Sequence, residues 1–227
     1  MLKFFYHPTP NPLKVALMLE ELGEPYETIA VDTLAGDQHK PGFRAINPNG
    51  KVPAIADGEV VVFDSNAILL YLAEKTGRFL PTNPVERGDA LSWLMFIATG
   101  LSPFSGQAIH FLRVAPEPKD YALKRYSSEI DRHYKVLDQR LEGRDWIVGS
   151  AISIVDFAAW GWARYLPYFT GEAGHDAYPN VKRWYHAIAA RPAAERALAL
   201  ADKVHVKKDW DADALANLFP GTHGKAA

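Results

Sequence analysis

The hydrophobic pattern of this 227-residue chain changes near residue 80, and that change limits the folds open to the chain. Before it, short apolar runs alternate with segments whose apolar residues recur at helical spacing. After it, only the helical spacing persists. The pattern therefore predicts an α/β domain over residues 1–80, an all-α domain over residues 86–201 and a tail over residues 202–227.

The first domain is predicted to follow the order β-α-β-α-β-β-α. Leu2–Tyr6 forms the first strand, and Asn11 then supplies a helix N-cap followed by Pro12 at the first helical position. Gly23 ends this helix, because glycine suits the residue just past a helix end. Asp57-Gly58 separates two apolar runs, which predicts a β-hairpin.

The second domain is predicted to contain helices alone. Two prolines in Leu80–Pro84 mark a linker. Beyond it, four segments have apolar residues at helical spacing: Glu86–Arg113, Lys119–Leu141, Ser153–Tyr168 and Tyr178–Ala189. Ser153 and Asp156 have the spacing of a capping box, which we interpret as structural.

The composition excludes several classes of function. Lys and Arg total 25 against 27 Asp and Glu, a net charge of -2, so nothing draws the whole chain to nucleic acid or to an anionic membrane. The chain has no cysteine, which excludes disulfides, thiolate metal sites and catalysis by a thiol of the protein. Thiol-based redox chemistry would need a sulfur supplied by another molecule. No apolar run is long enough to span a membrane, so we expect a cytoplasmic protein.

Four segments together resemble the glutathione transferase family, over roughly residues 1–201. They are TPNPLKVALMLEELG, NPNGKVPAI, FDSNAILLYLAEKTG and the SIVD capping sequence at Ser153. The TPN turn, Gln38 and the SGQ-H-F stretch at 105–111 are similar to the bacterial Nu class and to its relative, the yeast nitrogen-regulator domain. The resemblance implies a thioredoxin-like first domain, glutathione as co-substrate, no metal, and a homodimer.

Thr9 and Asn11 are the candidate catalytic residues, because they lie where the first strand ends and the first helix begins. Hydroxyl, amide and main-chain donors there, with the positive end of the helix dipole, can stabilise a thiolate. Thr9 is too weak an acid to serve as a base, so its expected role is to donate a hydrogen bond to the sulfur. The same residues also suit a simple turn and helix cap. Tyr6, where many transferases place a catalytic tyrosine, shares a strand face with Phe4 and is interpreted as a core residue.

Two further motifs resemble the family's glutathione-binding residues. Val52-Pro53 resembles its cis-proline turn, where the main chain pairs with the cysteinyl unit of glutathione; an ordinary trans proline opening a strand is the alternative. Ser65, a possible N-cap, would meet the γ-glutamyl carboxylate while Asp64 pairs with the ammonium. Many family members carry glutamate at the Asp64 position, and the aspartate side chain here is shorter, so its carboxylate extends less far toward the ammonium.

Gln38, Lys51 and Arg132 complete the expected binding residues. In resembling proteins, Gln38 and Lys51 reach the glycyl carboxylate or a second glutathione, and Arg132 matches an arginine that contacts glutathione. Each also suits a surface role. Six residues of the second domain could line a pocket for an electrophile, although core packing is the more common use of rings at helical spacing: Phe104, Gln107, His110, Phe111, Trp162 and Tyr165.

We therefore expect an enzyme that ionises glutathione for attack on an electrophile or for reduction of a disulfide. Disulfide reduction suits a chain without cysteine, because both sulfurs can come from two glutathione molecules. The alternative is a non-catalytic glutathione-binding regulatory or interaction module of the same fold.

Overall fold

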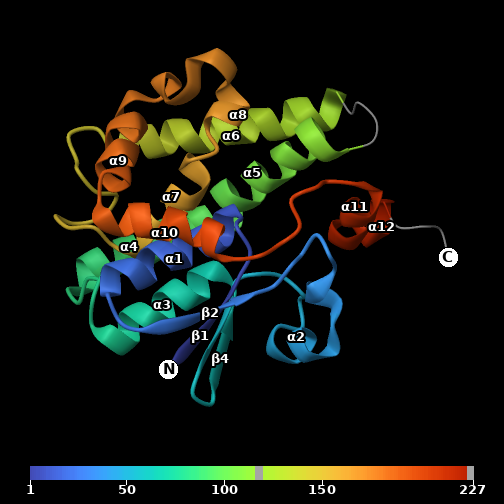
Figure 1. The fold of residues 1–227 in the computed structure, drawn as a ribbon. Helices are drawn as coiled ribbons and strands as arrows, with labels where there is room; N and C mark the ends of the chain where they lie inside the picture. Colours follow the sequence, from blue (N-terminus) through green and yellow to red (C-terminus); the bar gives the residue numbers. More distant parts are fainter. Residues whose placement is uncertain (116–119, 224–227) are drawn as a thin grey trace. The chain divides into compact units, whose positions relative to one another are not determined.

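The structure, a computed structural model, describes residues 1–115 and 120–223. Its chain divides into two compact units (Figure 1). The first holds Met1–Tyr71 and the segment that begins at Arg196, and the second holds Leu72–Glu195. Among the described residues, no helix combines the length and apolar character that crossing a membrane requires.

The first unit is built on a four-stranded mixed sheet of order β2-β1-β3-β4. Strand β1 pairs in parallel with β2 and antiparallel with β3, which in turn pairs antiparallel with β4. The predicted β-α-β-α-β-β-α order is confirmed. Its elements are β1 (Leu2–Tyr6), α1 (Pro10–Leu22), β2 (Tyr26–Ala30), η1 (Asp37–His39), α2 (Pro41–Ile46), β3 (Ala54–Asp57), β4 (Val60–Phe63) and α3 (Ser65–Thr76).

Helix α1 begins earlier than predicted. Its N-cap is Thr9 and its first helical residue is Pro10, so the prediction of Asn11 as N-cap is wrong. The physical reason is that proline carries a helical φ and needs no hydrogen bond at the first helical position, and Pro10 meets that condition before Pro12 does. The predicted end is confirmed: Gly23 has φ 71° and its N–H donates to the Leu19 carbonyl.

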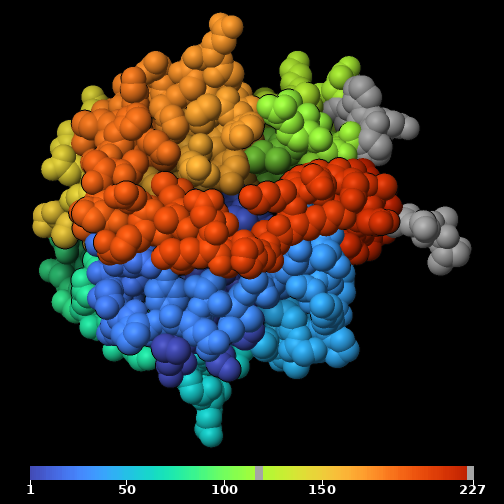
Figure 2. Space-filling view, viewed as in Figure 1, coloured from blue at the N-terminus to red at the C-terminus, as the bar shows by residue number. Residues whose placement is uncertain are grey.

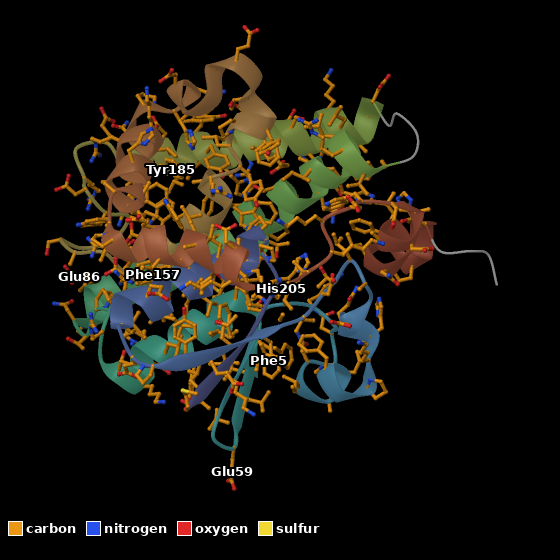
Figure 3. All side chains as sticks on the ribbon, viewed as in Figure 1. Phe5, Glu59, Glu86, Phe157, Tyr185 and His205 are labelled. Atoms are coloured by element: carbon orange, nitrogen blue, oxygen red, sulfur yellow. The ribbon has the colours of Figure 1, made fainter. Side chains whose placement is uncertain are left out.

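A hydrophobic core of the first unit forms around Phe5 of β1. Phe5, labelled in Figure 3, packs with Val31 just after β2, Phe43 of α2 and Ala54 of β3, and all four are buried. The Phe5 and Phe43 ring centroids lie 5.9 Å apart. This cluster therefore joins α2 to the strands β1 and β3.

The second unit contains helices, as predicted, although its first predicted helix is interrupted. Two π-helical turns, η2 and η3, separate and follow the α-helical pieces of Glu86–Arg113. Lys119, where the next helix was expected to begin, lies outside the described residues. The elements are α4 (Pro84–Phe96), η2 (Ile97–Leu101), α5 (Ser102–Ile109), η3 (His110–Val114), α6 (Asp120–Arg140), α7 (Ile154–Ala163), α8 (Pro167–Thr170), η4 (Gly171–Ala177) and α9 (Pro179–Ala189).

The C-terminal segment carries more structure than the sequence indicated. Helix α10 (Pro192–Lys203) is followed by two short helices, α11 (Ala212–Leu218) and α12 (Pro220–His223). Asp211 caps α11 by accepting a hydrogen bond from the main-chain N–H of Ala214 at 2.9 Å. The residues after Lys203 thus form part of the first unit rather than a featureless tail.

Asp156 is the polar centre of the second unit. Its carboxylate accepts hydrogen bonds from the N–H groups of Ile147 and Ser153, from the Ser153 hydroxyl and from the Trp184 indole, at 2.8–3.0 Å. Ser153 in return accepts from Val155, which confirms the predicted capping box. Asp156 is fully buried, and this burial raises the pKa of its carboxyl group against the opposing effect of the four donors.

Lys14 is a charged residue in the interior next to the first unit's α3. The side chain is 0% exposed, and its Nζ donates to the Ser65 hydroxyl at 3.4 Å. Burial lowers the pKa of Lys14 to about 7, and the negative charge of Asp64 acts in the opposite direction. The Lys14 amine therefore loses its proton far more readily in the folded protein than an exposed lysine does.

We predict that Asp156→Ala lowers the free energy of unfolding by about 3–5 kcal/mol, because four buried donors lose their acceptor. Ser153→Ala is the matched control and should cost about 1 kcal/mol, the scale of one N-cap. Urea unfolding of both variants measures the difference. Equal losses would contradict the central role of Asp156.

We predict that Lys14→Met removes part of the pH dependence of stability. Between pH 7 and pH 10.5 the unfolded chain binds the lysine proton and the folded chain does not, so wild-type stability rises with pH. The variant should lose that rise, up to about 1.4 kcal/mol per pH unit. Urea unfolding across this range, with the exposed Lys3→Met as control, measures it. Parallel curves for wild type and Lys14→Met would refute the prediction.

Candidate functional site

Thr9 occupies the N-cap of α1 without capping the helix. The residue is extended, with φ -135° and ψ 166°, and its side chain accepts no hydrogen bond from the first turn. A capping side chain bonds the N–H of the second or third helical residue, and here the third is Pro12, which has none. The Thr9 hydroxyl makes a long 3.4 Å contact to the His7 carbonyl. The hydroxyl is thus placed at the positive end of α1 and is not used to build it.

Asn11 and Tyr6 lie on either side of this turn. Asn11 is the second residue of α1 and is half-buried. Tyr6 ends β1, is 2% exposed, and its ring lies 5.4 Å from that of Phe4. This burial agrees with a core role for Tyr6.

Asp64, and not Ser65, caps α3. Asp64 Oδ1 accepts hydrogen bonds from the N–H groups of Asn66 at 2.8 Å and Ala67 at 3.2 Å, so the expectation of Ser65 as N-cap is wrong. Asp64 adopts φ 73°, a left-handed conformation that aspartate tolerates better than most residues. Because Asp64 does the capping, the Ser65 hydroxyl is released from that role and instead meets Lys14, while Ser65 itself is 4% exposed.

The Val52-Pro53 peptide bond is cis, as the resemblance implied. The preceding turn is held by Asn47, whose side-chain amide donates to the Lys51 carbonyl and whose Oδ1 accepts from Asn49. Lys51 is exposed and Val52 is half-buried immediately before β3. The turn therefore presents main chain at the start of a strand, the arrangement that recognises an extended peptide.

Gln38 is buried in η1 and is held from two directions. Its side-chain Nε2 donates to the Thr33 carbonyl at 3.0 Å and to the Asn217 carbonyl at 2.9 Å. The residue is 3% exposed. Its amide nitrogen is thus engaged within the first unit, unlike the free surface glutamine that the sequence allows.

Arg132 lies in the second unit, on α6, where it is paired with an acidic neighbour. Its Nε and Nη2 donate to Glu129 Oε2 at 3.0 and 2.9 Å. Hydrogen bonds from Arg125 and Arg132 hold the pKa of Glu129 below its ordinary value. A ligand that used Arg132 would therefore share the guanidinium with Glu129.

Two of the six pocket candidates of the second unit pack on aromatic neighbours outside that set. The Phe104 ring lies 5.1 Å from His133 and 6.2 Å from Tyr126, and Phe111 stacks on Tyr126 at 5.4 Å. Trp162 is 7% exposed, which agrees with a core role. The others are less buried: Phe104, His110, Phe111 and Tyr165 are half-buried and Gln107 is exposed.

All the predicted site residues except Arg132 belong to the first unit. They are Thr9, Asn11, Gln38, Lys51, Val52, Pro53, Asp64 and Ser65. In the part of the chain that the structure describes, no group of three His, Asp or Glu residues could hold a metal.

Sequence reasoning missed two residues of this region, Lys14 and Asn217. Lys14 interrupts the apolar face of α1 at a position that helical spacing assigns to the interior, and that mismatch was the available signal. Asn217 gave no signal, because its partners lie 179 and 183 positions away in the chain.

Both halves of the chain match family models. Residues 9–75 match the glutathione S-transferase N-terminal domain and residues 97–192 match the glutathione S-transferase C-terminal domain. The chain is 43% identical over 205 residues to the disulfide-bond oxidoreductase YfcG of Escherichia coli, covering 87% of this chain and 94% of that protein.

Two solved structures show the same fold. A glutathione transferase from Burkholderia graminis, with two glutathione molecules bound per subunit, has a TM-score of 0.81 and 42% identity, and the match covers 87% of each chain. A glutathione transferase from Pseudomonas putida, with one glutathione disulfide bound per subunit, has a TM-score of 0.82 and 36% identity, covering 87% of this chain and 90% of that one. With both family models matched and these likenesses at hand, the chain belongs to the glutathione transferase family.

Proposed function

We propose that the first unit binds glutathione, ionises its thiol and uses the thiolate to reduce disulfides. The observation that carries the proposal is the Thr9 hydroxyl, which stands at the N-cap of α1 and does not cap it. A hydroxyl in that place can donate to a sulfur, and the helix dipole favours the charged form of the thiol.

We assign each of the remaining residues of the first unit to one part of glutathione. The main chain of Val52, before the cis Pro53, pairs with the cysteinyl unit. The Ser65 hydroxyl and the first N–H groups of α3 take the γ-glutamyl carboxylate, and the nearby Lys14 ammonium adds favourable charge. Asp64 Oδ1 already accepts the two capping hydrogen bonds of α3, so Oδ2 is the oxygen that pairs with the γ-glutamyl ammonium.

Three residues complete the binding site as we propose it. Asn11 adds a second donor to the sulfur, Lys51 provides positive charge for the glycyl end, and Arg132 is the third candidate contact with glutathione, as the family resemblance implies. Gln38 lies in η1 of the first unit, between β2 and α2.

The reaction balances with two glutathione molecules and no cysteine of the protein. The first thiolate attacks one sulfur of the substrate disulfide, forms a mixed disulfide and releases the other sulfur as a thiolate, which takes up a proton. A second glutathione thiolate then attacks the glutathione sulfur of the mixed disulfide, giving glutathione disulfide and the second product thiol. The name of the Escherichia coli relative, and the two glutathiones or one glutathione disulfide in the related structures, support this choice over conjugation. On family resemblance, we also propose a cytoplasmic homodimer.

We expect the protein to catalyse the reduction of hydroxyethyl disulfide by glutathione. The rate is measured by coupling the formation of glutathione disulfide to glutathione reductase. Turnover with 1-chloro-2,4-dinitrobenzene should be the slower of the two, because disulfide reduction is the proposed main reaction. Conjugation without disulfide reduction would contradict the proposal. Glutathione binding without turnover of either substrate would identify a non-catalytic binding module instead.

We expect Thr9→Ala to raise the pKa of bound glutathione by roughly one to two units, since a hydrogen bond to a charged group contributes about 1.5–3 kcal/mol. Tyr6→Phe should leave that pKa almost unchanged, and Thr9→Ser, which keeps the hydroxyl, should stay close to wild type. A pH titration of the thiolate's ultraviolet absorbance in each complex measures these values. A shift in Tyr6→Phe with none in Thr9→Ala would assign the thiolate to the tyrosine.

A further inference from the structure

A segment of the C-terminal region, which we call the strap (residues 204–219), lies on the first unit. Figure 2 shows this red segment against the blue surface of the unit. The main-chain N–H of Lys207 donates to Asp32 Oδ2 at 2.7 Å, and the Lys207 ammonium pairs with Asp211. Because Asp211 also caps α11, this end of the strap is fixed to both the unit and the helix that follows.

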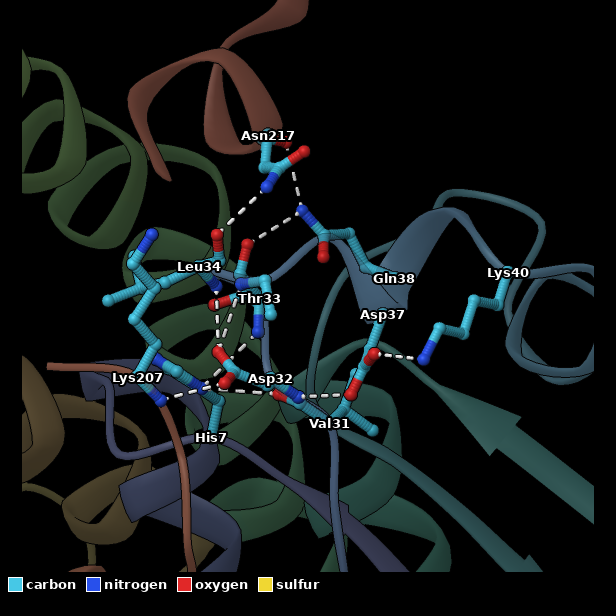
Figure 4. A network of polar contacts seen from close by, with 11 residues as sticks. His7, Val31, Asp32, Thr33, Leu34, Asp37, Gln38, Lys40, Lys207 and Asn217 are labelled. Carbon is cyan, nitrogen blue, oxygen red and sulfur yellow. Dashed lines mark hydrogen bonds and ion pairs between the residues drawn. The ribbon is translucent and has the colours of Figure 1, made fainter. Parts of the chain in front are cut away.

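The other end of the strap is fixed by Asn217 (Figure 4). Its side-chain amide donates to the Leu34 carbonyl at 2.9 Å, and its main-chain carbonyl accepts from Gln38 Nε2 at 2.9 Å and His39 Nε2 at 2.8 Å. The contact is close: a Cβ on Gly36 would lie 3.0 Å from Asn217 Oδ1. Asn217 therefore joins residues 34–39 into one hydrogen-bonded group.

This group fixes the direction of the Gln38 amide. Both hydrogens of Nε2 are directed to carbonyl oxygens, those of Thr33 and Asn217. Reversing the amide would place its oxygen against the same two acceptors, so the nitrogen must face them. Gln38 Oε1 is then buried, and it has no hydrogen-bond partner among the described residues.

A buried acceptor without a donor costs free energy, and a ligand that brings a donor recovers it. The loop that holds Gln38 borders the proposed peptide-binding turn, since a Cβ on Gly50 would lie 3.1 Å from the Gln38 carbonyl. Gly50 leads directly to Lys51 and Val52. Glutathione supplies N–H donors from its two peptide bonds and its ammonium group, and its carboxylates supply none.

We propose that Asn217 is a positioning residue for glutathione, which rests on the proposed function. Its side chain, bonded to Leu34, fixes its main-chain carbonyl against the Gln38 amide, so that Gln38 Oε1 accepts a hydrogen bond from an N–H of the ligand. The strap is in this way a part of the binding site, although it lies at the far end of the chain. In this proposal Gln38 accepts a hydrogen bond from an N–H of glutathione and does not donate one to the glycyl carboxylate.

The test is a double-mutant cycle of glutathione affinity, measured by calorimetry on the full chain. Asn217→Ala removes the donor to Leu34 that fixes the main-chain carbonyl of residue 217, and Gln38→Ala removes the amide itself. Each should weaken binding about five- to tenfold, the scale of one hydrogen bond. The double variant should bind no worse than the weaker single variant, because Asn217 acts through Gln38. Lys208→Ala, exposed on the same strap, should match wild type. Asn217→Asp, which also removes the donor to Leu34, should repeat the loss if Asn217→Ala does not fold.

The glycyl ethyl ester of glutathione separates the two roles of Gln38. The loss caused by Gln38→Ala should be the same for the ester as for glutathione. A loss that vanishes with the ester would overturn the proposal, since the amide would then be reading the carboxylate. Additive effects, unchanged affinity or tighter binding in Asn217→Ala would also overturn it. Failure of the wild type to bind glutathione would instead reject the proposed function.

Discussion

Two prolines in the first turn of α1 are the constraint on which the candidate site depends. Pro10 starts the helix with a preset φ, and Pro12 removes one of the two N–H groups that a capping side chain can bond. The helix consequently forms without the Thr9 hydroxyl. A group that would ordinarily stabilise the fold is available for chemistry, at the point where the helix dipole is most positive.

The same separation of structural and chemical roles occurs at the start of α3. Asp64 accepts the left-handed conformation and provides the cap, so the Ser65 hydroxyl can turn to Lys14. The buried ammonium is costly for the fold, because desolvation disfavours its charge. An anionic carboxylate bound at Ser65 would offset that cost. Ligand binding therefore accounts for the buried lysine, whereas the stability of the free protein does not.

The order of elements was predictable from the sequence because strands and helices leave different apolar periods, and resemblance added the cis bond before Pro53. Capping was predicted less well. Asn11 and Ser65 both have N-cap chemistry, but Thr9, two residues before Asn11, and Asp64, directly before Ser65, have the backbone conformation that the helix start requires. The contact of Asn217 with Gln38 had no trace in local sequence, since it joins positions 179 residues apart.

A crystal structure of the protein with glutathione tests the central claim most directly, by giving the position of the sulfur relative to the β1–α1 turn. The account predicts that the sulfur lies within hydrogen-bonding distance of Thr9 Oγ1, with the γ-glutamyl carboxylate at Ser65. A sulfur bonded to the Tyr6 hydroxyl and out of reach of Thr9 would contradict it.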